Sequence, residues 1–167
     1  MKRFLLLLPV LLMMACTKTY NLTPDYKAEA DSIIARVNAL PCNDVIRICL
    51  FTDCHYTGTE TEFLRLMSTI DYLNDHLHPA FVLNLGDITE ETVENYLFTT
   101  GRLDSLGVRY INIPGNHRDA KMLPSLLREH ATNIPHAVFS DKGAFFYFDD
   151  HQRHIRYVCL ATTETGM

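Results

Sequence analysis

Apolar runs alternate with helical patterns along most of this chain. Three short runs rich in apolar and β-branched residues, at positions 45–51, 80–85 and 108–113, predict β-strands, the first suited to a buried parallel position. Between them, apolar residues recur at the spacing of amphipathic helices. Strands that alternate with helices are typical of an α/β domain with a largely parallel sheet. The pattern therefore predicts a layered α/β sheet with flanking helices.

Capping and helix-breaking residues indicate where the predicted helices begin and end. The first helix should begin at Pro24, carry Ile33, Ile34 and Val37 on one face, and end before Pro41. A further helix is expected over residues 119–130.

Two central helices have clearer signals. Thr59 and Glu62 form a capping-box pattern, and an apolar stripe follows with Phe63, Leu66, Met67, Ile70, Leu73 and Leu77. Thr89 should open the next helix, with Glu90 in its first turn and Gly107 at its end. Its expected core face comprises Val93, Tyr96, Leu97, Leu103 and Leu106.

The pattern changes towards the end of the chain. Residues 144–148 and 154–161 read as two strands, separated by a polar turn at residues 150–153, and so predict a β-hairpin.

Length and composition favour one domain. A chain of 167 residues with 47% apolar content can build one sizeable core, which we expect over residues 26–167. The formal net charge is -5, and removal of Lys2 and Arg3 would take it to -7. This charge disfavours a nucleic-acid-binding surface.

The N-terminus resembles an export signal. Lys2 and Arg3 precede an apolar run at residues 4–14, which is shorter than the ~20 residues that span a bilayer. We expect a signal peptide at residues 1–15 with a lipobox-like end, acylation of Cys16, and a lipid-anchored tether at residues 16–25. The chain would then be an exported, membrane-anchored lipoprotein in the periplasm or on the cell surface. The alternative is an ordinary signal peptide with a coincidental Cys16.

Polar residues follow each of the three central strands. Asp53 and His55 follow the first, Asp87 follows the second, and Asn116 with His117 follows the third. Ligands bind beyond the carboxyl ends of strands in open α/β sheets. Carboxylate, imidazole and amide groups suit a divalent first-row metal, and a central Asp87 could bridge two ions.

Local geometry supports the first of these groups. An extended Asp53-Cys54-His55 segment would direct the first and third side chains to one side, and Cys54 to the other. Glycines 86 and 115 would allow tight turns before Asp87 and Asn116.

The motifs D-x-H at 53–55, G-D at 86–87 and G-N-H at 115–117 resemble, in this order, the calcineurin-like metallophosphoesterase family. The resemblance covers residues 45–161. It implies a two-metal hydrolase of phosphate mono- or diesters.

The resemblance also implies roles for individual residues. Asp53 and His55 would bind the first ion, Asp87 would bridge, Asn116 would bind the second ion, and His117 would act as general acid. The two divalent ions would be manganese, iron or zinc, and the substrate a phosphate ester. Neither the substrate-binding residues nor the oligomeric state follows from the sequence.

The sequence departs from the family pattern in two places. The family usually has Asp or Glu after the G-N-H histidine, whereas Arg118 and then Asp119 follow it here. Asp119 could substitute one residue late, Arg118 could hold phosphate, or the two could be a solvated pair. The family also has a later strand-end His and a G-H-x-H motif, which these 167 residues lack. We therefore expect a copy with its C-terminal half missing, a weak second metal site and low activity.

Two alternatives remain open. One is a non-catalytic exported lipoprotein that retains the half-domain for binding. The other is a cysteine-dependent hydrolase that uses Cys54 with His55 or His117. Cys49 and Cys159 lie within apolar runs and read as small buried thiols.

Overall fold

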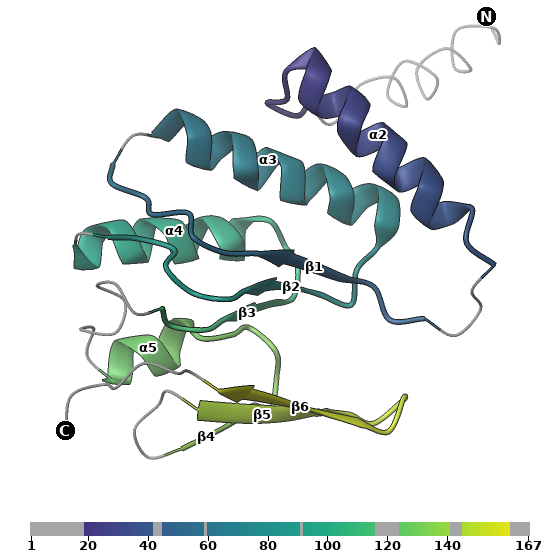
Figure 1. Cartoon of the computed structure of the whole chain (residues 1–167). Helices are drawn as coiled ribbons and strands as arrows, with labels where there is room; N and C mark the ends of the chain where they lie inside the picture. The colour runs from purple at the N-terminus through teal and green to yellow at the C-terminus, as the bar shows by residue number, and fades with distance from the viewer. Residues whose placement is uncertain are drawn as a thin grey trace, which may run out of the picture.

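The computed structural model describes residues 19–41, 45–58, 60–90, 92–115, 124–140 and 145–160 (Figure 1). Its helices and strands confirm the predicted α/β class. In chain order they are α2 (Pro24–Asn38), β1 (Ile48–Phe51), α3 (Glu60–Leu77), β2 (Phe81–Asn84), α4 (Val93–Ser105), β3 (Tyr110–Asn112), α5 (Pro124–His130), β4 (Val138–Phe139), β5 (Phe145–Asp150) and β6 (Ile155–Leu160).

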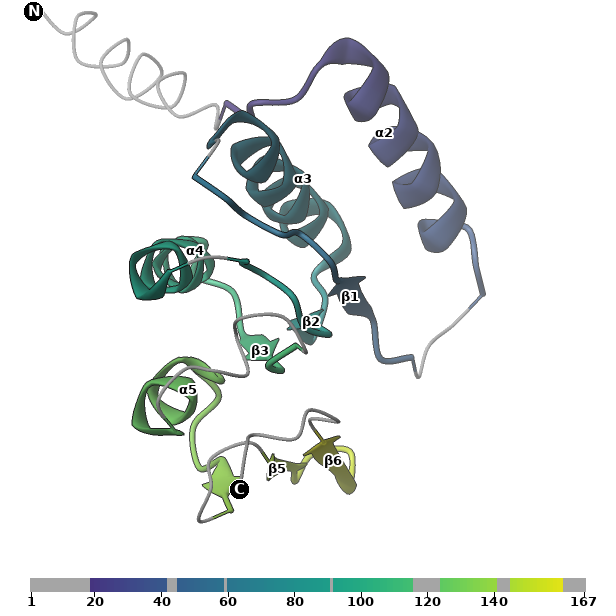
Figure 2. The same ribbon diagram turned by 60° about the vertical axis from the view of Figure 1, so that its left-hand side comes forward.

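The first sheet is parallel and has the strand order β1-β2-β3. Leu83 of β2 lies opposite Leu50 of β1 and Ile111 of β3. Helices α3 and α4 lie on one face of this sheet, α2 lies outside α3, and the second sheet lies on the other face (Figures 1 and 2). Because the strands are parallel, their carboxyl ends meet at one edge of the sheet.

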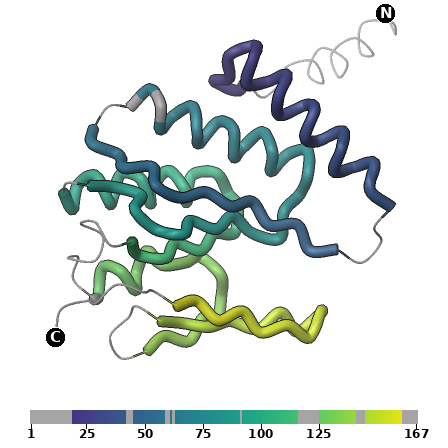
Figure 3. The backbone as a smooth tube through the Cα atoms, in the orientation of Figure 1, coloured from purple at the N-terminus to yellow at the C-terminus, as the bar shows by residue number. Residues whose placement is uncertain are grey.

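The second sheet is antiparallel, with the order β4-β5-β6. Strands β5 and β6 form the predicted hairpin, with a turn at residues 151–154, and Figure 3 shows the chain entering it from α5 through β4. Strand β4 has only two residues, which is too short for a recognisable sequence pattern.

Apolar side chains form two clusters, one on each face of the parallel sheet. The cluster between this sheet and the helices includes Phe63, Met67 and Ile70 of the predicted α3 stripe. The cluster between the two sheets includes Ile111 and Cys159. Apolar side chains therefore pack against both faces of the parallel sheet.

Strand β1 is less buried than we predicted from its sequence. It lies at the edge of the described sheet, and its side chains alternate. Cys49 and Phe51 pack against the helical cluster, whereas Ile48 and Leu50 are 39% and 60% exposed on the other face. The parallel position is confirmed, but burial on both faces is wrong because the second sheet does not cover this edge.

Helix α4 begins later than predicted. Thr89 was expected to open it, but Thr89 is fully buried and forms a β-bridge with Tyr56, so its backbone stays extended. Thr92 is the N-cap instead, and its side chain accepts a hydrogen bond from the Asn95 backbone N–H at 3.1 Å. Gly107, with φ +65°, follows the helix end as predicted.

The core face of α4 is also only partly as predicted. Tyr96 and Leu103 are buried, while Val93 and Leu97 are 47% and 41% exposed. The buried face of α4 instead includes Thr99 and Thr100, two polar residues that were not expected in the core.

The N-terminal helix begins at Pro24 and ends before Pro41, as predicted. Before it, the Tyr20 hydroxyl donates a hydrogen bond to Asp75 of α3 at 2.5 Å, so residue 20 lies against the domain. Within the described ranges, no helix has the length and apolar character needed to cross a bilayer. The expected signal peptide, Cys16 and the Thr59–Glu62 capping pattern lie outside what the structure describes.

Candidate metal centre

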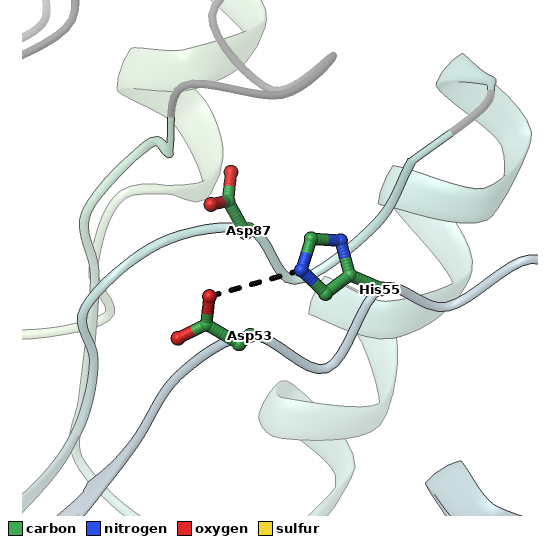
Figure 4. Close-up of side chains that lie close together, drawn as sticks. All are labelled: Asp53, His55 and Asp87. Carbon is green, nitrogen blue, oxygen red and sulfur yellow. Dashed lines mark ion pairs between the residues drawn. The ribbon is translucent and has the colours of Figure 1, made fainter.

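Asp53, His55 and Asp87 lie together at the carboxyl edge of the parallel sheet. Asp53 and His55 belong to the loop after β1, and Asp87 to the loop after β2 (Figure 4). One potential ligand atom from each residue lies within 4.8 Å of the other two. Two carboxylates and an imidazole at this separation can bind one divalent first-row ion.

The backbone at the site differs from the extended segment predicted from sequence. Asp53 and His55 have φ values of 55° and 45°, in the left-handed region, and Asp87 has φ 53°. The two outer side chains nevertheless share a side, and Cys54 packs against the helical core cluster. The predicted directions of these three side chains are therefore correct. A left-handed backbone at Asp53 and His55, and not an extended one, produces them.

Backbone hydrogen bonds join the two ligand loops beyond the ends of the strands. The N–H groups of Asp53, His55 and Tyr56 donate to the carbonyl oxygens of Gly86, Asp87 and Ile88, at 3.2, 3.0 and 3.1 Å. The two loops therefore run side by side, with Cys54 as one extra residue in the loop after β1. This pairing fixes Asp53 and His55 relative to Asp87.

Two glycines permit a close approach of the loops after β2 and β3. Gly86 has φ +122°, and a Cβ on it would lie 2.7 Å from the Gly115 Cα. A Cβ on Gly115 would lie 2.0 Å from Asp87 Oδ1 and 2.2 Å from the Asp87 nitrogen. Only glycine fits at either position, as expected for ligand loops that meet at one edge.

Glu90 also belongs to the site, although its sequence context suggested a helix start. Its Oε1 lies 2.7 Å from His55 Nδ1, which is buried. His55 Nε2 lies 3.7 Å from Asp53 Oδ1, on the side of the candidate ligands. Metal-binding histidines commonly contact a carboxylate through their second ring nitrogen, which orients the ring. The contact therefore leaves Nε2 for an ion.

Burial differs among these side chains. Asp87 is 8% exposed, whereas the Asp53 side chain is 62% exposed and that of His55 is 32% exposed. The group is thus enclosed on the Asp87 side and open to solvent on the Asp53 side. A solute could reach the cluster from that side.

A cavity of about 600 Å³ lies elsewhere, near the amino ends of β2 and β3. Its lining includes Arg109, His151, Arg153 and Tyr157, and none of the three candidate ligands. The three candidate metal ligands and this cavity therefore lie in different parts of the molecule.

Other predicted site residues lie outside the described ranges. These are Asn116, His117, Arg118 and Asp119, which follow Gly115 in sequence. Among the cysteines that the structure describes, Cys49, Cys54 and Cys159 form no disulfide. Cys159 is buried, as predicted, and Cys49 is partly buried.

The fold and the site together define an α/β protein with a candidate metal centre at its strand ends. The model of a family described as calcineurin-like phosphoesterase matches residues 46–164. The chain therefore belongs to the calcineurin-like phosphoesterase family, in agreement with the resemblance of its motifs. No curated protein matches the chain, and no solved structure does.

Proposed function

We propose that this protein hydrolyses phosphate mono- or diesters with divalent metal ions. The observation that supports the proposal is the cluster of Asp53, His55 and Asp87 in a chain of the calcineurin-like phosphoesterase family. Divalent ions at such sites activate water and neutralise charge on phosphoryl oxygens.

The described residues supply the ligands of one ion. Asp53 would bind through its carboxylate and His55 through Nε2, since Nδ1 lies against Glu90. Asp87 would be shared with a second ion, for which Asn116 would offer an amide oxygen. This oxygen and nitrogen donor set suits manganese, iron or zinc.

His117 is the proposed general acid. It would donate a proton to the leaving-group oxygen as the phosphorus–oxygen bond breaks. Its support is the G-N-H motif, in which it follows Gly115 by two residues. Gly115 itself lies against Asp87, so this motif begins next to a candidate ligand.

We also propose that the protein is exported and anchored to a membrane by a lipid on Cys16. The support is the sequence of residues 1–16 alone. Mass spectrometry of the full chain expressed in a bacterium should show an acylated Cys16 at the new N-terminus. A Cys16→Ser variant should lose the acyl group. An N-terminus at another residue, or a Cys16 without an acyl group, would refute the proposal.

Hydrolysis assays test the proposed activity. The purified, manganese-loaded chain should hydrolyse p-nitrophenyl phosphate or its diester at a low rate, as the missing G-H-x-H motif leads us to expect, and chelation should abolish turnover. Asp87→Asn should lower the rate by about 100-fold or more, because a lost shared ligand removes several kcal/mol of charge stabilisation. Asp149→Asn is the matched control, since this carboxylate pairs with Arg156 on the hairpin and should leave the rate unchanged.

A change of leaving group tests His117. A poor leaving group depends more strongly on protonation, so His117→Asn should slow phenyl phosphate more than p-nitrophenyl phosphate. Equal effects on both substrates would argue against the general-acid role. Metal binding without any turnover would favour a non-catalytic binding protein over the proposed enzyme.

A further inference from the structure

Three buried polar side chains form a hydrogen-bonded row beneath the candidate metal centre. Asn84 ends β2, Asn112 ends β3, and Tyr96 belongs to α4. Their exposed fractions are 0%, 1% and 1%. Asn84 Nδ2 donates to Asn112 Oδ1 at 2.5 Å, and Asn112 Nδ2 donates to the Tyr96 hydroxyl at 3.1 Å. The row thus joins both strands to the helix that covers them.

The row also reaches the ligand loops. Asn84 Oδ1 accepts a hydrogen bond from the Gly86 N–H at 3.2 Å. The Gly86 carbonyl accepts in turn from the Asp53 N–H at 3.2 Å and from Thr52 Oγ1 at 3.4 Å. Gly86 is therefore held at its nitrogen by the row and at its oxygen by the loop that carries Asp53.

The same row sets the distance between β2 and β3 where their loops begin. The Ile113 N–H donates to the Asn84 carbonyl at 3.0 Å, next to the bond between the two asparagine side chains. Just beyond it, Gly86 and Gly115 approach too closely for a Cβ on either. A change in strand separation here would therefore alter the contact between Gly115 and Asp87.

Core packing alone does not explain why residues 84 and 112 are asparagines. A buried amide needs hydrogen-bond partners to offset its desolvation, and an apolar side chain of similar size often stabilises a core as well. Asn84 and Asn112 are the last residues of otherwise apolar strands, at the boundary between core and site. At this position, their side chains can fix the backbone of the loops that follow β2 and β3.

We propose that Asn84, Asn112 and Tyr96 are positioning residues for the metal centre. They hold Gly86, and through it the backbone at Asp53 and Asp87, in the arrangement that brings the ligand atoms together. The inference rests on the proposed function, because it assigns the row a task at that site.

The proposal is tested by measuring both Mn²⁺ affinity and thermal stability in the same variants. We would titrate Mn²⁺ into the metal-free full chain by calorimetry, record the Mn²⁺ electron paramagnetic resonance spectrum, and follow thermal unfolding. Asn84→Ala and Tyr96→Phe should each weaken Mn²⁺ binding by about 10-fold and broaden the spectrum, as outer-shell changes do.

Asn133→Ala is the matched control. Asn133 accepts from the Tyr110 N–H at 2.8 Å and donates to the Val108 carbonyl at 2.7 Å, at the opposite end of β3. It should lower stability and leave Mn²⁺ affinity within twofold of the unmodified chain.

The possible outcomes separate the two proposals. Unchanged affinity in Asn84→Ala and Tyr96→Phe, or an equal loss in Asn133→Ala, would overturn the positioning role. If Asn84→Ala does not fold, Tyr96→Phe decides, because it removes a single oxygen. Failure of the unmodified chain to bind Mn²⁺ would instead refute the metal centre itself, and with it the positioning role.

Discussion

The candidate ligands occupy backbone positions that residues with side chains rarely adopt. Asp53, His55 and Asp87 all have φ between 45° and 55°. Such positions cost about 1–3 kcal/mol each and persist only where surrounding contacts hold them. The hydrogen bonds between the loops after β1 and β2 supply those contacts. At the residue scale, the site is therefore favourable for metal binding and unfavourable for stability.

Replacement of Asp53 by glycine or by alanine tests this strain. Both changes remove a ligand, but only glycine adopts φ 55° without a Cβ clash. Asp53→Gly should be more stable than Asp53→Ala by about 1 kcal/mol in urea unfolding of the metal-free chain. At Glu29, inside α2, the order should reverse, with glycine less stable than alanine by about 1 kcal/mol. If the glycine variant were less stable than the alanine variant at both positions, Asp53 would be unstrained.

Gly115→Ala tests the contact between the loops after β2 and β3. The added Cβ would lie 2.0 Å from Asp87 Oδ1, so Asp87 must move. We expect a loss of about 1–3 kcal/mol in stability and weaker metal binding in titrations. A Cβ on Gly101 of α4 meets nothing within 4 Å, so Gly101→Ala should be neutral or stabilising. Normal metal affinity in Gly115→Ala would contradict the described approach.

At the scale of elements, periodicity predicted the order and type of the central helices and strands. It placed the start of α4 at Thr89, whereas Thr92 caps the helix. The choice depends on Tyr56, 33 residues before Thr89, whose carbonyl accepts from the Thr89 hydroxyl at 2.9 Å. Likewise, the exposure of Leu50 depends on how far the second sheet extends, which the pattern of β1 does not contain.

Substitution of the two threonines distinguishes the helix starts. Thr92→Ala removes the side-chain cap of α4 and should cost about 1 kcal/mol in urea unfolding, with metal affinity unchanged. Thr89→Val removes the bond to Tyr56 in the ligand loop and should weaken metal binding. If Thr92→Ala cost nothing while Thr89→Val shortened the helix, the sequence-based start would be correct after all.

At the scale of the whole molecule, the two apolar clusters stabilise the parallel sheet from both faces, and the sheet brings the strand ends together. The sequence predicted the cluster of Asp53, His55 and Asp87 because parallel strands share a carboxyl edge. It did not predict the contact of Glu90 with His55, since residues 89–91 read as a helix start. An asparagine at the end of two neighbouring apolar strands was a usable signal for the buried row. The roles of Asn116, His117 and Cys16 remain predictions.

The buried layer between the sheets predicts a loss of stability at alkaline pH. Burial raises the pKa of the Cys159 thiol from 9.0 to about 11. Because the unfolded chain loses this proton first, the stabilisation is intact below pH 9 and is lost as pH rises to 11.

Urea unfolding under reducing conditions between pH 8 and 11 should therefore show falling stability, with a smaller fall in Cys159→Ala. Part of the fall should remain, because burial also raises the pKa of the Tyr110 hydroxyl. An identical pH dependence in both chains would show that the thiol is accessible to water in the folded state.

Calorimetric titration of the metal-free chain with Mn²⁺ tests the central claim most directly. We predict saturable binding of at least one ion per chain, lost in His55→Ala and in Asp87→Asn, and retained in Asp149→Asn. Absence of saturable binding, or binding that survives both site substitutions, would contradict the assignment of Asp53, His55 and Asp87 as a metal centre.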